Sequence, residues 1–414
     1  MTAITSVNPF TGKEIGSFET HSESEISQII KRADIRFFSW RETPFKERKR
    51  LMFAAAAELE KNKQEYAETM TLEMGKPIAQ SIAEIKKCAW VCEYYAENAE
   101  VQLQAELIKT DAYKSYVSHE PLGVVLAVMP WNYPFWQVLR FAAPALMAGN
   151  VAILKHASNV FGSALNLEKV FKRAGFPEHC FSTLLVGSDS VAQIIENKLV
   201  KAVTLTGSGS AGSAVAATAG EHIKKTVLEL GGSNALLVLK DCDIDKTVAT
   251  CVQARFQNTG QSCIAGKRLL VDESISEEFL EKLLQKVSEL KSGNPMAVDT
   301  YIGTLAREDL AIDLEKQVNS SIKAGANLAI GGKRHGAYFE PTILTQVKES
   351  MLVFKEETFG PVLSVTTFKT LDEAITLSNN SRFGLGVSVF TTDIEAIEKL
   401  VSRFDEGAVF VNYL

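Results

Sequence analysis

The sequence predicts an α/β protein that contains two doubly wound parallel sheets. Short apolar strands alternate with helical segments from residue 134 onward, and a second alternating series begins near Ser233. This alternation favours parallel strands that are joined by crossover helices. The glycine pair Gly231-Gly232 lies between the two series and marks the join between two predicted α/β units.

The N-terminal part of the chain is predicted to be helical. Between residues 24 and 101, apolar side chains recur at helical spacing, and Pro44 and Pro77 divide the segment into three amphipathic helices. The pattern then becomes extended in Tyr113–Val117 and Val124–Met129, which are rich in valine and tyrosine. These two segments are predicted to be strands.

Each α/β series has its own set of predicted strands. After Val124–Met129, the first series continues with strands at Val151–Lys155, Phe181–Val186 and Ala202–Thr206. The second series has strands at Ala235–Val238, Leu269–Val271, Val362–Thr367 and Val387–Phe390. Helical segments separate the strands in both series, as a parallel sheet with crossover helices requires.

Length and composition limit the class of protein. With 414 residues the chain is long enough for two or three domains. Its 46% hydrophobic and 23% charged residues are typical of a globular protein. The net charge of −6 provides no basic surface for a polyanion, so nucleic acid is not expected as a partner. Neither a signal peptide nor an apolar stretch of about 18 residues is found, so no membrane partner is expected.

The six cysteines favour a reducing, cytoplasmic location. They show neither the density of a secreted disulfide scaffold nor paired Cys-x-x-Cys spacing. Cys88 and Cys92 lie four residues apart in a helical segment, but no histidine is near them. Core packing or a helix flank is therefore the expected role of this pair, and no metal site is predicted.

One cysteine has flanking residues that suggest chemistry. Cys263 lies in the segment Gly260–Arg268, and the strand-like segment Leu228–Gly232 places the carboxylate of Glu229 on another turn. A thiolate that adds to a carbonyl carbon, together with a carboxylate that later deprotonates water, is a basis for covalent catalysis. The alternative is a small buried cysteine, although the flanking glycines are turn residues rather than core residues.

The segment Gly207–Gly212 fits the dinucleotide-binding fingerprint Gly-x-Gly-x-x-Gly. It follows the predicted strand that ends at Thr206 and begins a helix, where backbone N–H groups can meet a phosphate. The alternative is a glycine-rich turn without a ligand. Glu229 lies about where this fingerprint has a ribose-binding acid. From the residues alone, Glu229 is therefore either a cofactor ligand or a catalytic base.

A proline-bracketed turn follows the predicted strand Val124–Met129. Within Pro130–Pro134, the side-chain amide of Asn132 is in a position to donate a hydrogen bond to a developing oxyanion. Taken alone, such a segment is more often a turn in which the asparagine has only a structural role.

Taken together, these segments resemble the NAD(P)-dependent aldehyde dehydrogenase superfamily, and the resemblance covers the whole chain. The motifs that carry it are Pro130–Pro134, Lys155–Ser158, Thr206-Gly207-Ser208 with Gly212, Glu229–Gly232, Gly260–Cys263 and Glu356–Pro361. The helix Phe135–Arg140 and the segment Gln257–Cys263 are most similar to the short bacterial succinate-semialdehyde dehydrogenases.

The resemblance implies a covalent mechanism. Cys263 is the implied nucleophile, which gives a thiohemiacetal and, after hydride transfer to the nicotinamide, a thioester. Asn132 and the backbone N–H of Cys263 are the implied oxyanion donors. Glu229 is the implied base for the hydrolytic water, because the family binds ribose through other residues.

The resemblance also implies NADP or NAD as the cofactor. The implied cofactor contacts are Trp131, Lys155, Ser158, Thr206, Gly207, Ser208, Gly212, Leu230, Glu357 and Phe359. Among them, Ser208 corresponds to a pyrophosphate contact and Phe359 to a neighbour of the nicotinamide ring. NAD-preferring relatives often carry a glutamate at the position of Ser158, so the short neutral serine permits the 2′-phosphate of NADP.

The implied substrate is succinate semialdehyde. Arg140 matches an arginine that semialdehyde-specific relatives use for the distal carboxylate, and an exposed arginine without a ligand is the alternative. Trp136 and Gln257 are the other implied substrate contacts. Some relatives have a second arginine at the position of Gln257, so another aliphatic aldehyde is an alternative substrate. Acyl transfer to coenzyme A is a further alternative, against which Glu229 argues.

The resemblance also implies a domain division. Residues 1–110 and 124–230 are expected to form the cofactor-binding domain, 111–123 the oligomerisation strands, and 231–414 the catalytic domain. The sequence stops at Val409–Leu414 without the family's following Phe-Gly-Gly and Ser-Gly segment, so the small β oligomerisation element is expected to be incomplete. With that tail present, a homo-oligomer is expected, either a dimer or a tetramer. A truncated, non-catalytic nucleotide-binding product is the alternative to an active enzyme.

Overall fold

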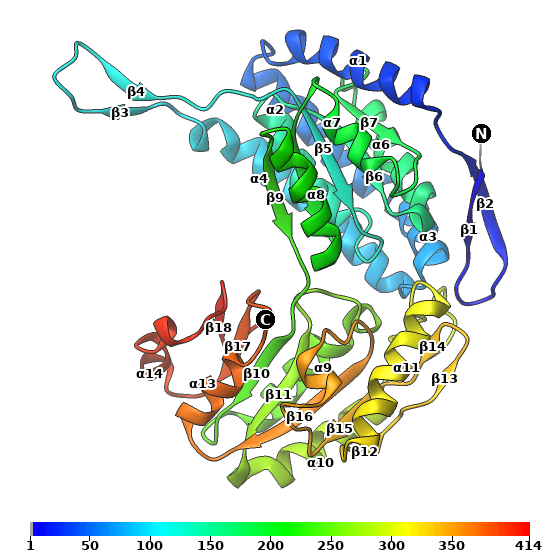
Figure 1. Cartoon of the computed structure of the whole chain (residues 1–414), viewed down its shortest axis with the longest axis vertical. Coiled ribbons are helices and arrows are strands. Elements are labelled where there is room, and N and C mark those ends of the chain that lie inside the picture. The colour runs from blue at the N-terminus through cyan, green and yellow to red at the C-terminus, as the bar shows by residue number, and fades with distance from the viewer. Residues whose placement is uncertain (1–2) are drawn as a thin grey trace. The chain divides into compact units, whose positions relative to one another are not determined.

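The computed structural model describes residues 3–414, which form two compact units (Figure 1). The first unit comprises the described residues up to Asn8, Lys13–Glu73 and Ser81–Glu229, and the second comprises Pro9–Gly12, Met74–Gln80 and Leu230–Leu414. Each unit is built around its own parallel sheet. Within residues 3–414, no helix has both the length and the apolar character needed to cross a membrane.

The chain begins with an antiparallel hairpin and a series of helices. Their bounds are β1 (Ala3–Val7), β2 (Glu14–Glu19), α1 (Glu23–Trp40), α2 (Phe45–Lys61), α3 (Lys63–Met74) and α4 (Ile78–Gln102). Four helices occupy the region for which three were predicted, because α2 and α3 are separate helices on either side of Asn62. The break at Asn62 carries neither proline nor glycine, so the sequence pattern did not reveal it.

A five-stranded parallel sheet forms the centre of the first unit. Its strands are β5 (Val124–Met129), β6 (Val151–His156), β7 (Phe181–Leu184), β8 (Val200–Thr206) and β9 (Lys225–Glu229). The connecting elements are α5 (Trp136–Met147), η1 (Ser158–Val160), α6 (Phe161–Arg173), α7 (Val191–Glu196) and α8 (Gly209–Glu221). The strand order β7-β6-β5-β8-β9 reverses direction at β5. The predicted doubly wound parallel sheet is therefore confirmed in this unit.

A short hairpin extends from the rest of the first unit (Figure 1). It consists of β3 (Glu106–Ile108) and β4 (Ser115–Val117), which pair antiparallel. The strand β4 lies within the predicted strand Tyr113–Val117. The strand β3 was not predicted, because all three of its side chains are exposed and it shows no apolar alternation.

The second unit contains a seven-stranded sheet with the order β12-β15-β16-β11-β10-β17-β18. Its strands are β10 (Asn234–Val238), β11 (Gly266–Asp272), β12 (Asn327–Ile330), β15 (Thr342–Thr345), β16 (Val362–Phe368), β17 (Val387–Phe390) and β18 (Val409–Val411). A separate small hairpin pairs β13 (Arg334–His335) with β14 (Tyr338–Phe339). The four strands predicted for this unit form the centre of the sheet, β16-β11-β10-β17. Only β12 pairs antiparallel, at one edge.

Helices and single turns connect the strands of the second sheet. They are α9 (Ile244–Phe256), η2 (Gln257–Gly260), η3 (Glu273–Ile275), α10 (Ser276–Ser288), α11 (Glu308–Lys323), α12 (Leu352–Lys355), α13 (Leu371–Asn379), α14 (Ile394–Glu398) and η4 (Val401–Arg403). On β10, Ala235 and Leu237 belong to one hydrophobic core, whereas Leu236 and Val238 belong to another. Successive strand residues point to opposite faces, so both faces of this sheet are buried.

The buried carboxyl of Glu73, on α3, holds the start of α6. Its side chain accepts hydrogen bonds from the backbone N–H groups of Gly162 at 2.6 Å and Ser163 at 2.9 Å, and from the Ser163 hydroxyl at 2.7 Å. These N–H groups lie in the first helical turn, where no helix carbonyl accepts them. Burial raises the pKa of Glu73 to about 7, although the hydrogen bonds act to lower that pKa.

A carboxyl whose pKa is raised by folding stabilises the folded chain most at low pH. We expect the contribution of Glu73 to the free energy of unfolding to fall as pH rises from 4.5, the ordinary pKa, to about 7. The expected loss is about 1–3 kcal/mol, and Glu73→Gln should remove most of it. Urea denaturation at several pH values checks this, with the exposed Glu65→Gln on the same helix as control. A Glu73→Gln profile parallel to that of the unmodified chain would contradict the raised pKa.

Candidate active site

Asn132 lies in the turn between β5 and α5, and its side chain is only 3% exposed. His156, at the end of β6, holds this turn. Its Nε2 lies 3.0 Å from the Pro134 carbonyl oxygen, and its Nδ1 lies 3.2 Å from the Met129 carbonyl oxygen and 3.0 Å from the Ala157 nitrogen. Burial lowers the pKa of His156 to about 4, although the bonds to the two carbonyls act to raise that pKa. The sequence had suggested no role for His156.

Glu84, on α4, holds the other side of the same turn. Its Oε1 accepts hydrogen bonds from the backbone N–H groups of Phe135 and Trp136, each at 2.9 Å. These groups lie at the beginning of α5, so the carboxylate acts as a cap for that helix. The indole of Trp136 is half-buried, and Nζ of Lys87 lies 4.0 Å from its ring centroid. Glu84 was not predicted as a site residue.

Three predicted site residues meet where β8 and β9 end. Nη2 of Arg140, on α5, lies 3.3 Å from Oε2 of Glu229 and donates to the Thr206 hydroxyl at 3.4 Å. Glu229 is the last residue of β9, and Thr206 is the last residue of β8. The side chains of Arg140 and Glu229 are 32% and 43% exposed, so a ligand can reach both. The guanidinium that was predicted to bind a substrate carboxylate therefore contacts a carboxylate of the chain itself.

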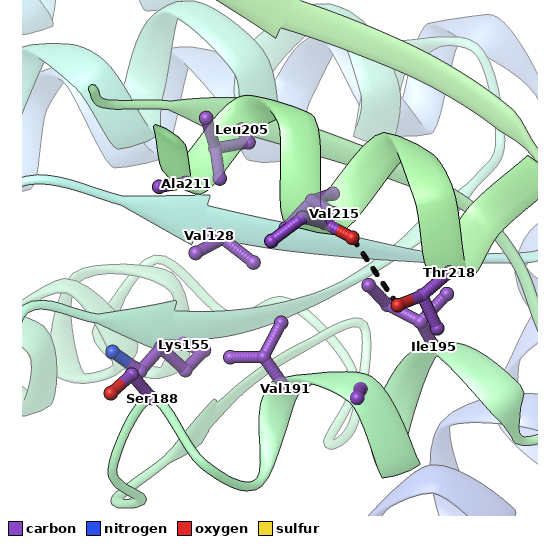
Figure 2. Close-up of a pocket in the computed structure, with 11 residues that line it drawn as sticks. Val128, Lys155, Ser188, Val191, Ile195, Leu205, Ala211, Val215 and Thr218 are labelled. Atoms are coloured by element: carbon purple, nitrogen blue, oxygen red, sulfur yellow. Dashed lines mark hydrogen bonds between the residues drawn. The ribbon is translucent and has the colours of Figure 1, made fainter. Parts of the chain in front are cut away.

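A pocket of about 290 Å³ lies between α7 and α8 (Figure 2). Figure 2 shows Val191 of α7 and Val215 of α8 on opposite sides of it, and Leu205 adds to its apolar wall. Lys155, at the end of β6, also lines the pocket, and burial lowers the pKa of its ammonium. An apolar slot beside a cation fits the base and the hydroxyl or phosphate groups of a dinucleotide.

The predicted fingerprint segment lies at the start of α8. The hydroxyl of Ser208 is the N-cap and accepts from the Ala211 N–H at 3.3 Å. A Cβ added to Gly209 would meet nothing within 4 Å, so the beginning of this helix is open on that side. Gly212 is buried in the first turn, and the half-buried Ser158 begins η1 after β6. These positions fit a bound pyrophosphate at a helix N-terminus.

In the second unit, Cys263 follows a turn in an unusual backbone conformation. Asn258, Thr259 and Gly260 have φ values of 55°, 54° and 72°. The left-handed region is unfavourable for a β-branched residue such as Thr259. A Cβ at position 260 would lie 2.4 Å from the Gly360 carbonyl oxygen, which explains the glycine there. Strain of this kind persists only where surrounding bonds hold it.

Two glutamines supply such bonds. Oε1 of Gln80 accepts from the Asn258 N–H at 2.6 Å, and Oε1 of Gln261 accepts from the Ala306 N–H at 2.9 Å. Gln261 is fully buried, whereas Cys263 is partly exposed. The thiol is therefore carried by a rigid turn and remains open to a reactant.

The Gly231-Gly232 pair leaves room for Glu357. Oε1 of Glu357 accepts from the Gly232 N–H at 3.2 Å, and a Cβ on Gly231 would lie 2.2 Å from Oε2. A Cβ on Gly232 would lie 2.8 Å from the Cys263 carbonyl oxygen. Nζ of Lys267 lies 3.1 Å from the same Glu357 oxygen. Three separate predicted motifs therefore meet within the second unit.

Arg255, on α9, holds the segment that carries Phe359. Its fully buried guanidinium donates to the carbonyl of Thr358 at 2.8 Å and to that of Gly360. The Phe359 ring is half-buried, and its centroid lies 6.0 Å from Nζ of Lys267. Neither Arg255 nor Lys267 was predicted as a site residue, because the basic residues in these segments carry no signal of what they contact.

The structure places the predicted site residues in two groups, one in each unit. The first unit contains Trp131, Asn132, Trp136, Arg140, Lys155, Ser158, Thr206, Gly207, Ser208, Gly212 and Glu229. The second unit contains Leu230, Gln257, Cys263, Glu357 and Phe359. Gln257 is exposed at the end of α9. The catalytic and binding roles assigned to these residues stay predictions.

Known proteins resemble the chain over nearly its whole length. The profile of the aldehyde dehydrogenase family matches residues 1–414. A probable succinate-semialdehyde dehydrogenase [NADP(+)] of Synechocystis sp. is 48% identical over 413 residues, covering 99% of this chain and 91% of the relative. A succinate-semialdehyde dehydrogenase [NADP(+)] of Mycobacterium avium is 46% identical over 416 residues, covering 99% and 88%.

Solved structures show the same likeness. The crystal structure of succinic semialdehyde dehydrogenase from Streptococcus pyogenes, in complex with NADP+, has a TM-score of 0.96 and 32% identity to this chain. The match covers 99% of this chain and 91% of the other. The chain belongs to the aldehyde dehydrogenase family.

Proposed function

We propose that the chain oxidises succinate semialdehyde to succinate with NADP or NAD, through a covalent intermediate on Cys263. The observation that carries the proposal is the partly exposed Cys263 thiol on a rigidly held turn. Membership of the aldehyde dehydrogenase family supports the reaction type. The names of the Synechocystis and Mycobacterium avium relatives support the substrate and the cofactor.

The proposed reaction assigns a separate role to each chemical group. The Cys263 thiolate attacks the aldehyde carbon and forms a thiohemiacetal. The side-chain amide of Asn132 and the backbone N–H of Cys263 donate hydrogen bonds to the oxyanion. Loss of hydride from the same carbon leaves a thioester on Cys263. Glu229 accepts a proton from the water that hydrolyses this thioester, which releases the acid.

The cofactor is proposed to occupy the pocket between α7 and α8 and the beginning of α8. When bound, its nicotinamide supplies the acceptor for the hydride. The proposed contacts of the chain are Trp131, Lys155, Ser158, Thr206, Gly207, Ser208 and Gly212 in the first unit, and Leu230, Glu357 and Phe359 in the second. The fit is supported by the apolar pocket wall, the Lys155 ammonium and the open start of α8.

Arg140 is proposed to bind the distal carboxylate of the substrate, and Trp136 and Gln257 are proposed as further substrate contacts. Its guanidinium already pairs with the Glu229 carboxylate. A substrate carboxylate that binds Arg140 competes with Glu229, since a guanidinium forms its best geometry with one bidentate partner. Binding of the semialdehyde therefore releases Glu229 to act as a base. A neutral aldehyde leaves the pair intact.

We also propose that the chain assembles as a homo-oligomer in the cytoplasm. The β3–β4 hairpin exposes large apolar side chains, with Leu107 73%, Tyr116 55% and Val117 47% exposed. Exposed apolar groups that lie together are typical of a protein interface. Throughout residues 3–414, no disulfide joins any of the six cysteines, which supports a reducing compartment.

Replacement of the proposed nucleophile tests the reaction. Cys263→Ala should lower the formation of reduced cofactor from succinate semialdehyde by more than about 1,000-fold, because the covalent intermediate is lost. Absorbance of the reduced nicotinamide measures turnover, and a fluorescence titration should show retained NADP binding. Cys242→Ala, which removes the other partly exposed thiol, should leave both unchanged. Substantial turnover by Cys263→Ala would contradict the proposed nucleophile.

Replacement of Arg140 tests the substrate class. Arg140→Gln should raise KM for succinate semialdehyde about 30-fold or more, because a charge-assisted bond to the carboxylate is lost. KM for butanal should change little. Initial rates with both aldehydes measure this difference, and Arg32→Gln, at an exposed position on α1, is the control. Equal changes for the two aldehydes would assign Arg140 a structural role only.

Replacement of Ser158 tests the choice of cofactor. Ser158→Glu should raise KM for NADP about 10-fold more than KM for NAD, because a carboxylate repels a 2′-phosphate. Ser158→Ala, which keeps the position neutral, should retain the use of NADP. Rates measured with both cofactors give the ratio. An unchanged ratio in Ser158→Glu would place the 2′-phosphate elsewhere.

A further inference from the structure

Lys267 is a fully buried lysine on β11, four residues after Cys263. Its neighbours along the strand include Leu269 and Leu270, which are also fully buried. An ammonium in such surroundings is costly unless hydrogen bonds and an opposite charge compensate it. An apolar residue is the ordinary occupant of such a strand position, so the presence of a charged residue needs an explanation.

All three donors of the Lys267 ammonium have acceptors. Nζ donates to the carbonyl oxygens of Ser262 at 2.8 Å and Cys263 at 2.9 Å. It also forms an ion pair with Oε1 of Glu357 at 3.1 Å. Two of the three acceptors are consecutive carbonyls of the turn that carries the thiol. The lysine therefore holds the backbone of that turn by direct hydrogen bonds.

The same ammonium fixes Glu357. Oε1 of Glu357 accepts from both Lys267 and the Gly232 N–H, and Oε2 lies where a side chain on Gly231 would stand. Both bonds reach the same oxygen, Oε1, and the Glu357 side chain is 20% exposed. One buried cation thereby connects the turn that carries Cys263 with Glu357, a residue proposed to bind the cofactor.

The charged groups that face Lys267 come from three segments. They are Glu357, which follows α12, Arg255, from α9, and the thiol of Cys263. Burial lowers the pKa of Lys267 to about 8, whereas Glu357 and the Cys263 thiolate act to raise that pKa. The ammonium therefore favours a thiolate at Cys263, and Glu357, paired with the same ammonium at 3.1 Å, offsets part of its positive charge.

We propose that Lys267 is a positioning residue for the reaction of Cys263. Its ammonium fixes the Ser262–Cys263 backbone, holds the Glu357 carboxylate in place, and supplies the positive charge that favours the thiolate. This inference rests on the proposed role of Cys263 as nucleophile. Without the lysine, the turn loses its anchor and the Glu357 carboxylate loses its cation.

The rate of Cys263 alkylation by iodoacetamide, measured across a range of pH, tests the proposal. The full chain with Cys242→Ala is the parent, so that Cys263 is the partly exposed thiol that reacts, and mass spectrometry identifies the modified residue. The variants are Lys267→Met, Glu357→Gln and the double variant. Lys286→Met, at an exposed lysine of α10, is the matched control.

The proposal predicts shifts of opposite sign. The pH at which the alkylation rate is half-maximal should rise by about one unit in Lys267→Met and fall in Glu357→Gln. The double variant should lie between them. Lys286→Met should match the parent. Half-maximal pH values that coincide in the parent, Lys267→Met and Glu357→Gln would overturn the proposal and leave the lysine a packing role only.

The test does not depend on the folding of Lys267→Met. Circular dichroism shows whether Lys267→Met folds. If it does not, the lower half-maximal pH expected for Glu357→Gln still tests the role of the charges. This variant should fold, because Glu357 is partly exposed and glutamine has nearly the same shape as glutamate. Alkylation needs neither aldehyde nor cofactor. Its result is therefore separate from the turnover of Cys263→Ala, which tests the proposed function itself.

Discussion

The loops of the candidate site depend on buried polar side chains that bond to backbone groups. A loop carries N–H and C=O groups that no helix or strand satisfies, and leaving them buried without acceptors or donors is costly. In the first unit, Glu84 and His156 bond to the turn that carries Asn132. In the second, Arg255 and Lys267 bond to the turns that carry Phe359 and Cys263. Long-range bonds, rather than the turn sequences alone, set these conformations.

Such anchors contribute more to geometry than to stability. Taking an ammonium or guanidinium out of water costs several kcal/mol per ion, and each hydrogen bond to a carbonyl returns about 1.5–3 kcal/mol. An apolar residue would fit a strand such as β11 at lower cost, as Leu269 shows. The advantage of the charged residue is that donors and dipoles are fixed before the reaction and need not reorganise during it.

Strands and site turns could be predicted from the sequence because their signals are local. The apolar runs of β5, β10 and β17 lie between recognisable turn residues, and the glycines around Cys263 mark a turn whatever contacts it. The edge strand β12 is half-exposed and antiparallel, and it carried no comparable signal. Glu84 was missed because its partner Phe135 lies 51 residues further along the chain. Lys267 lies four residues after the motif Gly260–Cys263, but a sequence does not say where a lysine directs its ammonium.

The two ion pairs of the candidate site differ in burial, and this difference bears on their proposed roles. Arg140 and Glu229 are 32% and 43% exposed, and pairs of this kind contribute about 0–1 kcal/mol. A carboxylate ligand can therefore displace Glu229 from Arg140 at little cost, as the proposed substrate binding requires. Lys267 is fully buried against Glu357, and removing one partner of a buried pair costs about 3–5 kcal/mol. The exposed pair is suited to exchange partners during turnover, whereas the buried pair is suited to remain intact.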